Sequence, residues 1–337
     1  MKSGKTKILK ILLPALAVAA LIILIILDAR EPEVQSQTYF DAFDTISTLY
    51  DYSGDKDFST VADTVGRMMQ DYHALYDIYH AAPAKSNLYT VNNSQGEWVA
   101  VDEKIIELLE WGIDIYALTE GEVNIAMGSV TTLWKSALKS GRLPTEAELA
   151  TAALHTDITK IEIDRSTSAV RLTDPEMTLD VGAVAKGFTE EKIAEWLISE
   201  GKRGYAIDMG GNLRAIGTKP SGEGFTTGIR NPNVDEGGFV ETFTLSDEAS
   251  ATSGGYERFY EIGGIKYHHI IDKDTLAPLD KYLSVSIVTK SAALADALST
   301  AVFCMTEDEI SELLTRLDGG IRIIVIDKDE KILHFDK

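Results

Sequence analysis

The chain has 337 residues and is 45% hydrophobic, which is enough apolar material for a substantial core in one large domain or two ordinary ones. Its formal net charge of −21 repels phosphate backbones, so the composition argues against a nucleic acid as partner. An acidic protein that binds a smaller anion must neutralise it locally, with a few placed cations or with a divalent metal.

The amino terminus, 1–30, has the composition of an export signal or a signal anchor. Lysines at positions 2, 5, 7 and 10 precede or enter an apolar run at 11–27, which acidic residues follow. This run of about 17 residues is short for a membrane span and long for a cleavable signal core. We expect an uncleaved anchor in the cell membrane that holds the rest of the chain outside the cytoplasm. Pro14 and the small residues after it leave a cleaved signal as the alternative.

A polar linker at 31–37 precedes the folded part, 38–337, in which strand-like and helix-like stretches alternate. A strand with a bulge is expected at 38–52, and helices at 58–79 and at 102–118, where Asp102 can cap the first turn. Further helices are expected at 145–154, 186–199, 291–305 and 307–316, and strands at 158–163, 205–216, 240–245, 283–289 and 321–335, the last turning near 328–330. The stretch 218–238, rich in Gly and Pro, is expected to be a mobile loop beside the site entrance.

This order of elements favours one fold class. Strands and helices do not follow a steady β-α-β-α pattern, so an α+β fold with mixed, largely antiparallel sheets and packed helices is favoured over a doubly wound parallel sheet. The single cysteine, Cys304, excludes an intramolecular disulfide and is expected to be a buried, inert thiol.

The segment 291–301, SAALADALSTA, carries the clearest candidate chemistry. Asp296 and Thr300 are four residues apart in a run of helix formers, so a carboxylate and a hydroxyl share one helix face. Such a pair of hard oxygen ligands suits Mg²⁺ or Ca²⁺, although a solvated helix face gives the same pattern.

Seven further blocks occur in an order that resembles the ApbE family of FAD:protein FMN transferases. They are FDT at 43–45, SNLYTVN at 86–92, GEVNIAMGSVTTLW at 121–134, LDVGAVAKGF at 179–188, DMGGNLRAIG at 208–217, TSGGYERF at 252–259 and YHHIIDKDTLAPLD at 267–280. The resemblance covers about residues 39 to 335 and implies the same α+β fold.

The resemblance also implies a set of site residues. The backbone oxygen of Ala183 would join the side chains of Asp296 and Thr300 around Mg²⁺, and Asp296 would serve catalysis. FAD contacts are implied at Phe43, Tyr79, Glu122, Val123, Asn124, Asp180, Lys186, Arg230 and Ile270. By their own chemistry some of these residues have simpler interpretations, because the two aromatic residues could be core and Asp180 could cap a helix. Arg230 and Arg258 are the cations expected near phosphate or adenine, and surface salt bridges are the alternative, above all for Arg258.

Two adjacent histidines, His268 and His269, precede two isoleucines and Asp272. On an extended segment adjacent side chains face opposite ways, so only one imidazole should enter a site. We expect His269 to be the general base that takes the proton from an incoming hydroxyl. A hydrogen-bonded structural histidine is the alternative.

The resemblance implies an exported, Mg²⁺-dependent enzyme that cleaves FAD at its pyrophosphate, passes FMN to a threonine or serine hydroxyl of an acceptor protein and releases AMP. Two alternatives remain. Water could reach the phosphorus instead, which gives an FAD pyrophosphatase, or the chain could be a flavoprotein that holds FAD and transfers electrons. The sequence lacks the motif Asp-Gly-x-Ser/Thr-Gly-Ala-Ser/Thr that the family modifies, so the acceptor is expected to be another chain.

Overall fold

The computed structural model describes residues 32–233, 237–255, 259–279 and 281–337. The expected anchor at 1–30 and Arg258 therefore lie outside the described residues. Within the described ranges, no helix combines the length and the apolar character that a membrane crossing requires.

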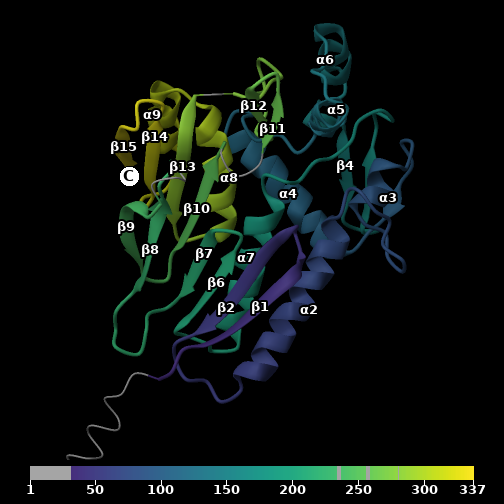
Figure 1. Cartoon of the computed structure of the whole chain (residues 1–337). Helices are drawn as coiled ribbons and strands as arrows, with labels where there is room; N and C mark the ends of the chain where they lie inside the picture. The colour runs from purple at the N-terminus through teal and green to yellow at the C-terminus, as the bar shows by residue number, and fades with distance from the viewer. Residues whose placement is uncertain (1–31, 234–236, 256–258, 280) are drawn as a thin grey trace, which may run out of the picture.

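An eight-stranded antiparallel sheet forms the centre of the molecule (Figure 1), with the strand order β1-β2-β6-β7-β10-β13-β14-β15. Its strands are β1 (Gln35–Ala42), β2 (Thr45–Asp51), β6 (Tyr205–Met209), β7 (Asn212–Ile216), β10 (Ala249–Gly254), β13 (Tyr282–Thr289), β14 (Arg322–Asp327) and β15 (Ile332–Asp336). Every neighbouring pair in this order is antiparallel, which confirms the expected α+β class with largely antiparallel sheets.

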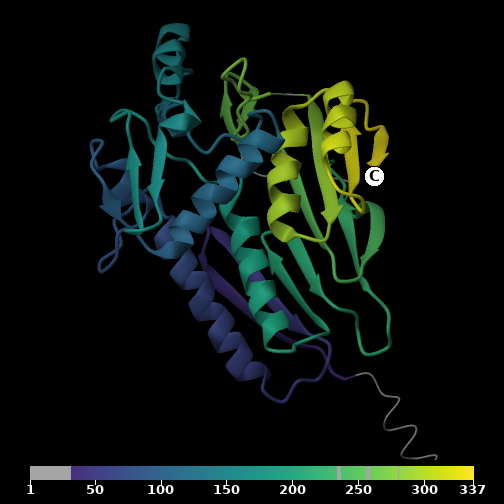
Figure 2. The ribbon, with the colours of Figure 1, turned by 180° about the vertical axis from the view of Figure 1, so that it is seen from behind.

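Three helices cover one face of this sheet, as Figure 2 shows from behind. They are α2 (Phe58–Tyr76), α7 (Ala185–Ser199) and α8 (Ala292–Cys304). Helix α8 is rich in small and apolar residues and is buried on nearly all sides, as expected for a helix without a polar face. Cys304, at its carboxyl end, is buried as expected, and this burial raises the pKa of the thiol to about 12.

The remaining elements extend this core. They include the helices α3 (Leu88–Asn92), α4 (Glu103–Leu118), α5 (Gly128–Lys139), α6 (Glu146–Ala153) and α9 (Glu307–Arg316), the sheet of β3 (Val99–Ala100), β5 (Ala169–Leu172) and β4 (Ile161–Asp164), and the hairpin of β11 (Phe259–Ile262) and β12 (Ile265–His268). A single cluster of buried side chains includes residues of α4, β5, α8, α9 and β14, so the large and the small sheet share one core.

Two expected single strands are hairpins. The segment 205–216 turns at Gly210 and Gly211, whose φ angles of 65° and 93° favour glycine. The segment 38–52 turns at Phe43 and Asp44, with φ angles of 56° and 50°. Strand β1 begins at Gln35, so it already includes the last residues of the expected linker at 31–37.

Three other expectations need correction. The stretch 218–238 is not a loop throughout, because β8 (Phe225–Arg230) pairs with β9 (Phe239–Leu245), and Ile229 packs on Ile324 and Ile326 of the large sheet. The expected strand at 158–163 begins as a 3₁₀ turn, η1 (Ile158–Lys160). Helix α2 ends at Tyr76 and not at residue 79.

Replacing Gly187 by Ala would add a methyl group where α7 crosses α8. A Cβ atom there would lie within 3.0 Å of the Asp296 side chain and of the Ala292 carbonyl oxygen. Overpacking costs about 1–3 kcal/mol, more than the roughly 1 kcal/mol that Ala gains over Gly in a helix. Urea unfolding should therefore give a lower free energy of unfolding for Gly187→Ala.

Gly319→Ala is the matched control, because the nearest atom to a Cβ at Gly319 would be 3.9 Å away. Its free energy of unfolding should stay within about 0.5 kcal/mol of the wild type. Equal losses in the two variants would contradict a tight crossing of α7 and α8.

Candidate active site

The Asp296 carboxylate joins three elements that are distant in sequence. Its Oδ1 atom accepts hydrogen bonds from Lys186 Nζ at 3.0 Å and from Asn212 Nδ2 at 2.8 Å. Its Oδ2 atom accepts from the backbone N–H of Gly187 at 2.7 Å. Gly187 lies in the first turn of α7, where backbone N–H groups have no partner within the helix and favour an anion. Helices α7 and α8 and strand β7 therefore meet at one buried carboxylate.

The other expected metal ligands lie close to this carboxylate in sequence or in space. Thr300 follows Asp296 by one helical turn, and its Oγ1 atom lies 3.5 Å from the backbone oxygen of Asp296. Ala183 is in the turn that leads into α7, three residues before Lys186. The set contains a carboxylate, a hydroxyl and a backbone carbonyl, all hard oxygen donors of the kind that Mg²⁺ prefers. This chemistry fits Mg²⁺.

These ligands form a sparse set. Across the part of the chain that the structure describes, no group of three or more His, Cys, Asp and Glu side chains is arranged to hold a metal ion. Mg²⁺ commonly binds through one or two carboxylates together with water and substrate phosphates. A site with Asp296 as its carboxylate is therefore suited to a metal that binds with a phosphorylated substrate.

Two further acids near Lys186 were not predicted. Glu190, one turn along α7, is fully buried, and neither carboxylate oxygen has a hydrogen-bond partner among the described residues. Burial raises its pKa well above the ordinary value, and Asp296 and Asp208 add to that effect. Burial also raises the pKa of Asp208, although the Gly211 N–H, Lys186 and Arg230 act against it. In the sequence, Glu190 is marked only by its spacing of four from Lys186.

A second polar cluster lies at the other end of the turn before α7. The Asp180 carboxylate accepts from Lys135 Nζ at 2.9 Å, from Thr131 Oγ1 at 2.7 Å and from the Gly182 N–H at 3.0 Å. Burial alone would raise the pKa of Asp180, but these donors hold it below its usual value. Lys135 also donates to the Tyr79 hydroxyl at 2.7 Å. The structure thus joins two predicted FAD contacts through a lysine that sequence reasoning missed.

The three expected FAD contacts at 122–124 differ in their surroundings. Glu122 pairs with Lys273 at 3.2 Å, and burial raises its pKa despite that lysine. Val123 is buried core. The Asn124 side chain donates to the Thr156 carbonyl at 2.9 Å and accepts from the Ala126 N–H at 2.9 Å. In this structure it therefore stabilises the conformation of the loop at 122–127.

That loop reaches the rest of the site through the backbone. The Asp180 N–H donates to the Ile125 carbonyl, and the Gly128 N–H donates to the Thr178 carbonyl. The Ser129 hydroxyl donates to the Ala152 carbonyl at 2.8 Å. The loop at 122–127 therefore lies directly beside the turn at 178–182.

Phe43 and Arg230 lie at the edges of this region. The Phe43 ring packs edge-on against His73, with ring centroids 5.5 Å apart. Thr45, at the end of the same turn, lies directly against Gly210, so the Phe43 turn sits beside the turn that precedes Asn212. Arg230 is exposed at the end of β8, and its positive charge acts to lower the pKa of Asp208.

The two histidines face opposite ways, as expected for an extended segment. His268 is 7% exposed, its Nε2 atom lies 2.8 Å from the Leu279 carbonyl oxygen, and its ring packs edge-on against Phe303 of α8. His269 is exposed, and Ile270 is buried. The segment therefore lies along the helix that carries Asp296, with His269 open to solvent, and its role as base stays a prediction.

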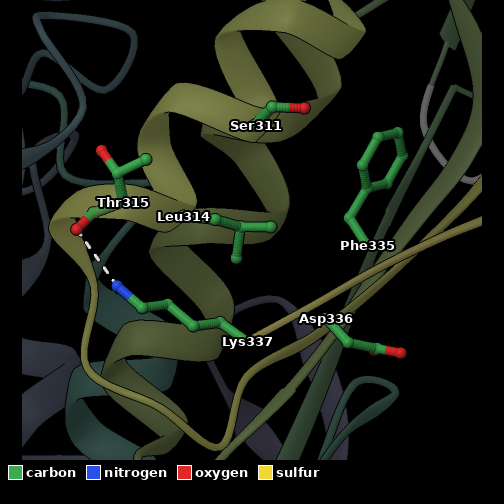
Figure 3. A pocket seen from close by; sticks show the side chains of 6 residues that line it. All are labelled: Ser311, Leu314, Thr315, Phe335, Asp336 and Lys337. Carbon is green, nitrogen blue, oxygen red and sulfur yellow. Dashed lines mark hydrogen bonds between the residues drawn. The ribbon is translucent and has the colours of Figure 1, made fainter.

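Two shallow cavities are formed by described residues. One of about 390 Å³ is lined by Asn124, Lys273 and Leu276 among others, next to the loop at 122–127. The other, about 370 Å³, lies between α9 and β15, where Lys337 Nζ donates to the Thr315 carbonyl at 3.1 Å (Figure 3). None of the predicted site residues lines the second cavity.

Glu190→Gln tests the buried acid on α7. Because the folded state holds this proton more tightly than the unfolded chain, Glu190 loses stabilising effect as the pH rises above its ordinary value of 4.5. Urea unfolding measures the free energy of unfolding of the variant minus that of the wild type. This difference should increase from pH 4.5 towards neutral pH, because the wild type loses stability over that range.

Glu148→Gln is a control of opposite sign. Arg142 and Thr145 lower the pKa of Glu148 to about 2, so the wild type should gain stability relative to this variant as the pH rises from 2 to 4.5. A stability difference for Glu190→Gln that does not change with pH would contradict the raised pKa.

Comparisons with known proteins identify the family of this chain. The sequence model of the ApbE family matches residues 43–325. A relative from Vibrio cholerae named FAD:protein FMN transferase is 28% identical over 273 residues, which are 78% of this chain and 80% of the relative. A relative of the same name from Treponema pallidum is 32% identical over 235 residues, 66% of this chain and 65% of that protein.

The crystal structure of the ApbE protein of Thermotoga maritima has the same fold. It superposes with a TM-score of 0.80 at 25% identity and covers 89% of this chain and 96% of its own. The family model spans both polar clusters, from the Phe43 turn to strand β14, so the chain belongs to the ApbE family.

Proposed function

We propose that this protein is an FAD:protein FMN transferase that depends on Mg²⁺ and modifies a threonine or serine hydroxyl of an acceptor protein. In the proposed reaction, the acceptor oxygen forms a bond to the phosphorus of the FMN half of FAD, the pyrophosphate bond breaks and AMP leaves. The proposal is supported by the family membership and by the names of the relatives. The structural observation that carries it is the Asp296 carboxylate, surrounded by Lys186, Gly187 and Asn212.

Asp296, Thr300 and the backbone oxygen of Ala183 would hold Mg²⁺. When bound, the ion would act as a Lewis acid towards the pyrophosphate oxygens. Lys186 would supply a positive charge beside the same oxygens, which an acidic protein with a net charge of −21 needs locally to accept an anionic dinucleotide.

The acceptor hydroxyl needs a base, because a threonine or serine hydroxyl is a weak nucleophile until its proton is removed. We assign this task to His269, whose exposure leaves its imidazole accessible to the hydroxyl of another protein. A ring nitrogen would take the proton. His268 is packed against Phe303 and supports the segment from within the fold.

We also propose that residues 1–30 anchor the protein in the cell membrane with the folded domain outside the cytoplasm. Cell fractionation and protease added from outside should show a membrane-bound protein that is digested in intact cells. A soluble mature form without residues 1–27 would instead identify a cleaved signal.

One mass spectrum separates this function from its alternatives. The soluble part of the chain is incubated with FAD, Mg²⁺ and a protein that carries the acceptor motif. An adduct of the mass of FMN on the acceptor supports the transferase. Free FMN and AMP without an adduct indicate a pyrophosphatase, and unchanged FAD that stays bound indicates an electron-transfer flavoprotein.

Asp296→Ala should abolish flavin transfer, because it removes the anionic oxygen among the proposed metal ligands. Thr300→Val should weaken Mg²⁺ binding with little effect on the fold. Titration of the variants with Mg²⁺, read by isothermal calorimetry and by thermal melts without metal, separates loss of the site from loss of the fold. Full activity in the presence of EDTA would show that the metal assignment is wrong.

His269→Ala should lower the turnover of transfer by about 10²–10⁴-fold, the usual size of general-base assistance, and leave FAD affinity within a few-fold. Because His269 is exposed, the melting temperature of the His269→Ala variant should match that of the wild type. His268→Ala is the contrast, since loss of the buried ring should lower the melting temperature. Unimpaired transfer by His269→Ala would exclude this histidine as the base.

A further inference from the structure

Lys135 occupies an unusual position between two predicted contacts of the substrate. It lies in the second turn of α5, and its side chain is 39% exposed. Its ammonium group donates to the Asp180 carboxylate at 2.9 Å and to the Tyr79 hydroxyl at 2.7 Å. Burial alone would lower the pKa of Lys135, but Asp180 and Tyr79 hold it above its usual value, so the group stays a cation.

Hydrogen-bonding capacity remains at this point of the surface. An ammonium group has three donors, and within the described ranges Lys135 uses two of them. An ionised carboxylate has about four acceptor positions, and Asp180 fills three through Thr131, Lys135 and Gly182. One donor and one acceptor thus lie next to each other, at a carboxylate that is 14% exposed and beside Gly182, which is exposed.

The nearly neutral charge of this cluster favours a neutral ring of FAD over its phosphates. Lys135 and Asp180 cancel each other's charge, so the pair adds little net attraction for a pyrophosphate. An adjacent donor and acceptor match a neutral group that offers the reverse pattern. The pyrimidine edge of the flavin ring is such a group, because it has an N–H donor between two carbonyl acceptors. Tyr79 is 54% exposed, and its ring offers a face on which a flat ring can stack.

We infer that Lys135 is a substrate-binding residue that, together with Asp180, reads the pyrimidine edge of the flavin ring of FAD. This inference rests on the proposed flavin transferase function and deepens it, because it places the flavin ring against α5 and the Tyr79 segment. Lys186 and Asp296 are left to the pyrophosphate end of the same substrate.

The test compares three ligands on the full chain. Isothermal calorimetry measures the dissociation constants of FAD, FMN and ADP for the wild type and for Lys135→Met. Loss of one charge-assisted hydrogen bond should raise the dissociation constants of FAD and FMN by about 10- to 100-fold. The dissociation constant of ADP, which has no flavin, should stay within about two-fold of the wild-type value. The shift of the flavin absorption band on binding should also change, a readout that a purely structural role would not alter.

Two matched variants complete the design. Lys139→Met removes the same charge one turn further along α5, at an exposed position, and should bind all three ligands like the wild type. Lys135→Arg keeps a cationic donor and should recover part of the lost FAD affinity. Thermal melts check that each variant is folded.

The other outcomes overturn the inference in different ways. Equal weakening of FAD and ADP binding by Lys135→Met, with FMN binding unchanged, would assign Lys135 to the adenine ring, and equal weakening of all three ligands would assign it to the phosphates. Unchanged affinity for all three ligands would remove Lys135 from the site, while the transferase proposal would stand. A wild type that binds neither FAD nor FMN would refute the proposed function itself, and this inference with it.

Discussion

The site depends on one buried carboxylate at a helix crossing. Asp296 is 7% exposed and accepts three hydrogen bonds, from the first turn of α7, from the Lys186 ammonium and from Asn212 of β7. A buried anion is tolerated only where such donors compensate for its lost hydration. Gly187 makes the arrangement possible, because a side chain at this position would collide with α8. The carboxylate thus fixes how two helices and a central strand meet.

The turn at 180–186 connects the two polar clusters. At its beginning Asp180 is bound by Lys135 and Thr131, and at its end Lys186 is bound by Asp296. The first cluster is nearly neutral, whereas in the second the acids Asp296, Asp208 and Glu190 lie around Lys186, with Arg230 also acting on Asp208. One turn therefore presents two chemically different surfaces, and the acidic one would accept phosphates only together with a bound divalent cation.

The buried acid Glu190 destabilises the fold next to this turn. Both of its oxygens are without a hydrogen-bond partner among the residues described, and burial favours the protonated form. Uncompensated polar groups of this kind gather at functional sites, where structure is kept for a purpose other than stability. Glu190 lies one helical turn from Lys186, so this destabilising group is close to the residues proposed to bind the phosphates.

The sequence by itself determined the elements whose signals are local. The spacing of Asp296 and Thr300 predicted a shared helix face, the alternation at the two histidines predicted opposite orientations, and the irregular order of strands and helices predicted an α+β class. The ordered motifs predicted the family. Each of these signals is contained within a few residues or in the order of short blocks, so no knowledge of packing is needed to read it.

Only the tertiary structure decided which distant residues meet. Lys135 and Asp180 are 45 residues apart, and Asn212 and Asp296 are 84 apart, so no periodicity connects them. The hairpin at 38–52 was missed because its two-residue turn at Phe43 and Asp44 contains no glycine, whereas the Gly210–Gly211 pair is a local signal for the turn of the hairpin at 205–216. The burial of Glu190 was equally invisible, since a glutamate on a helix is normally solvated until another element packs over it.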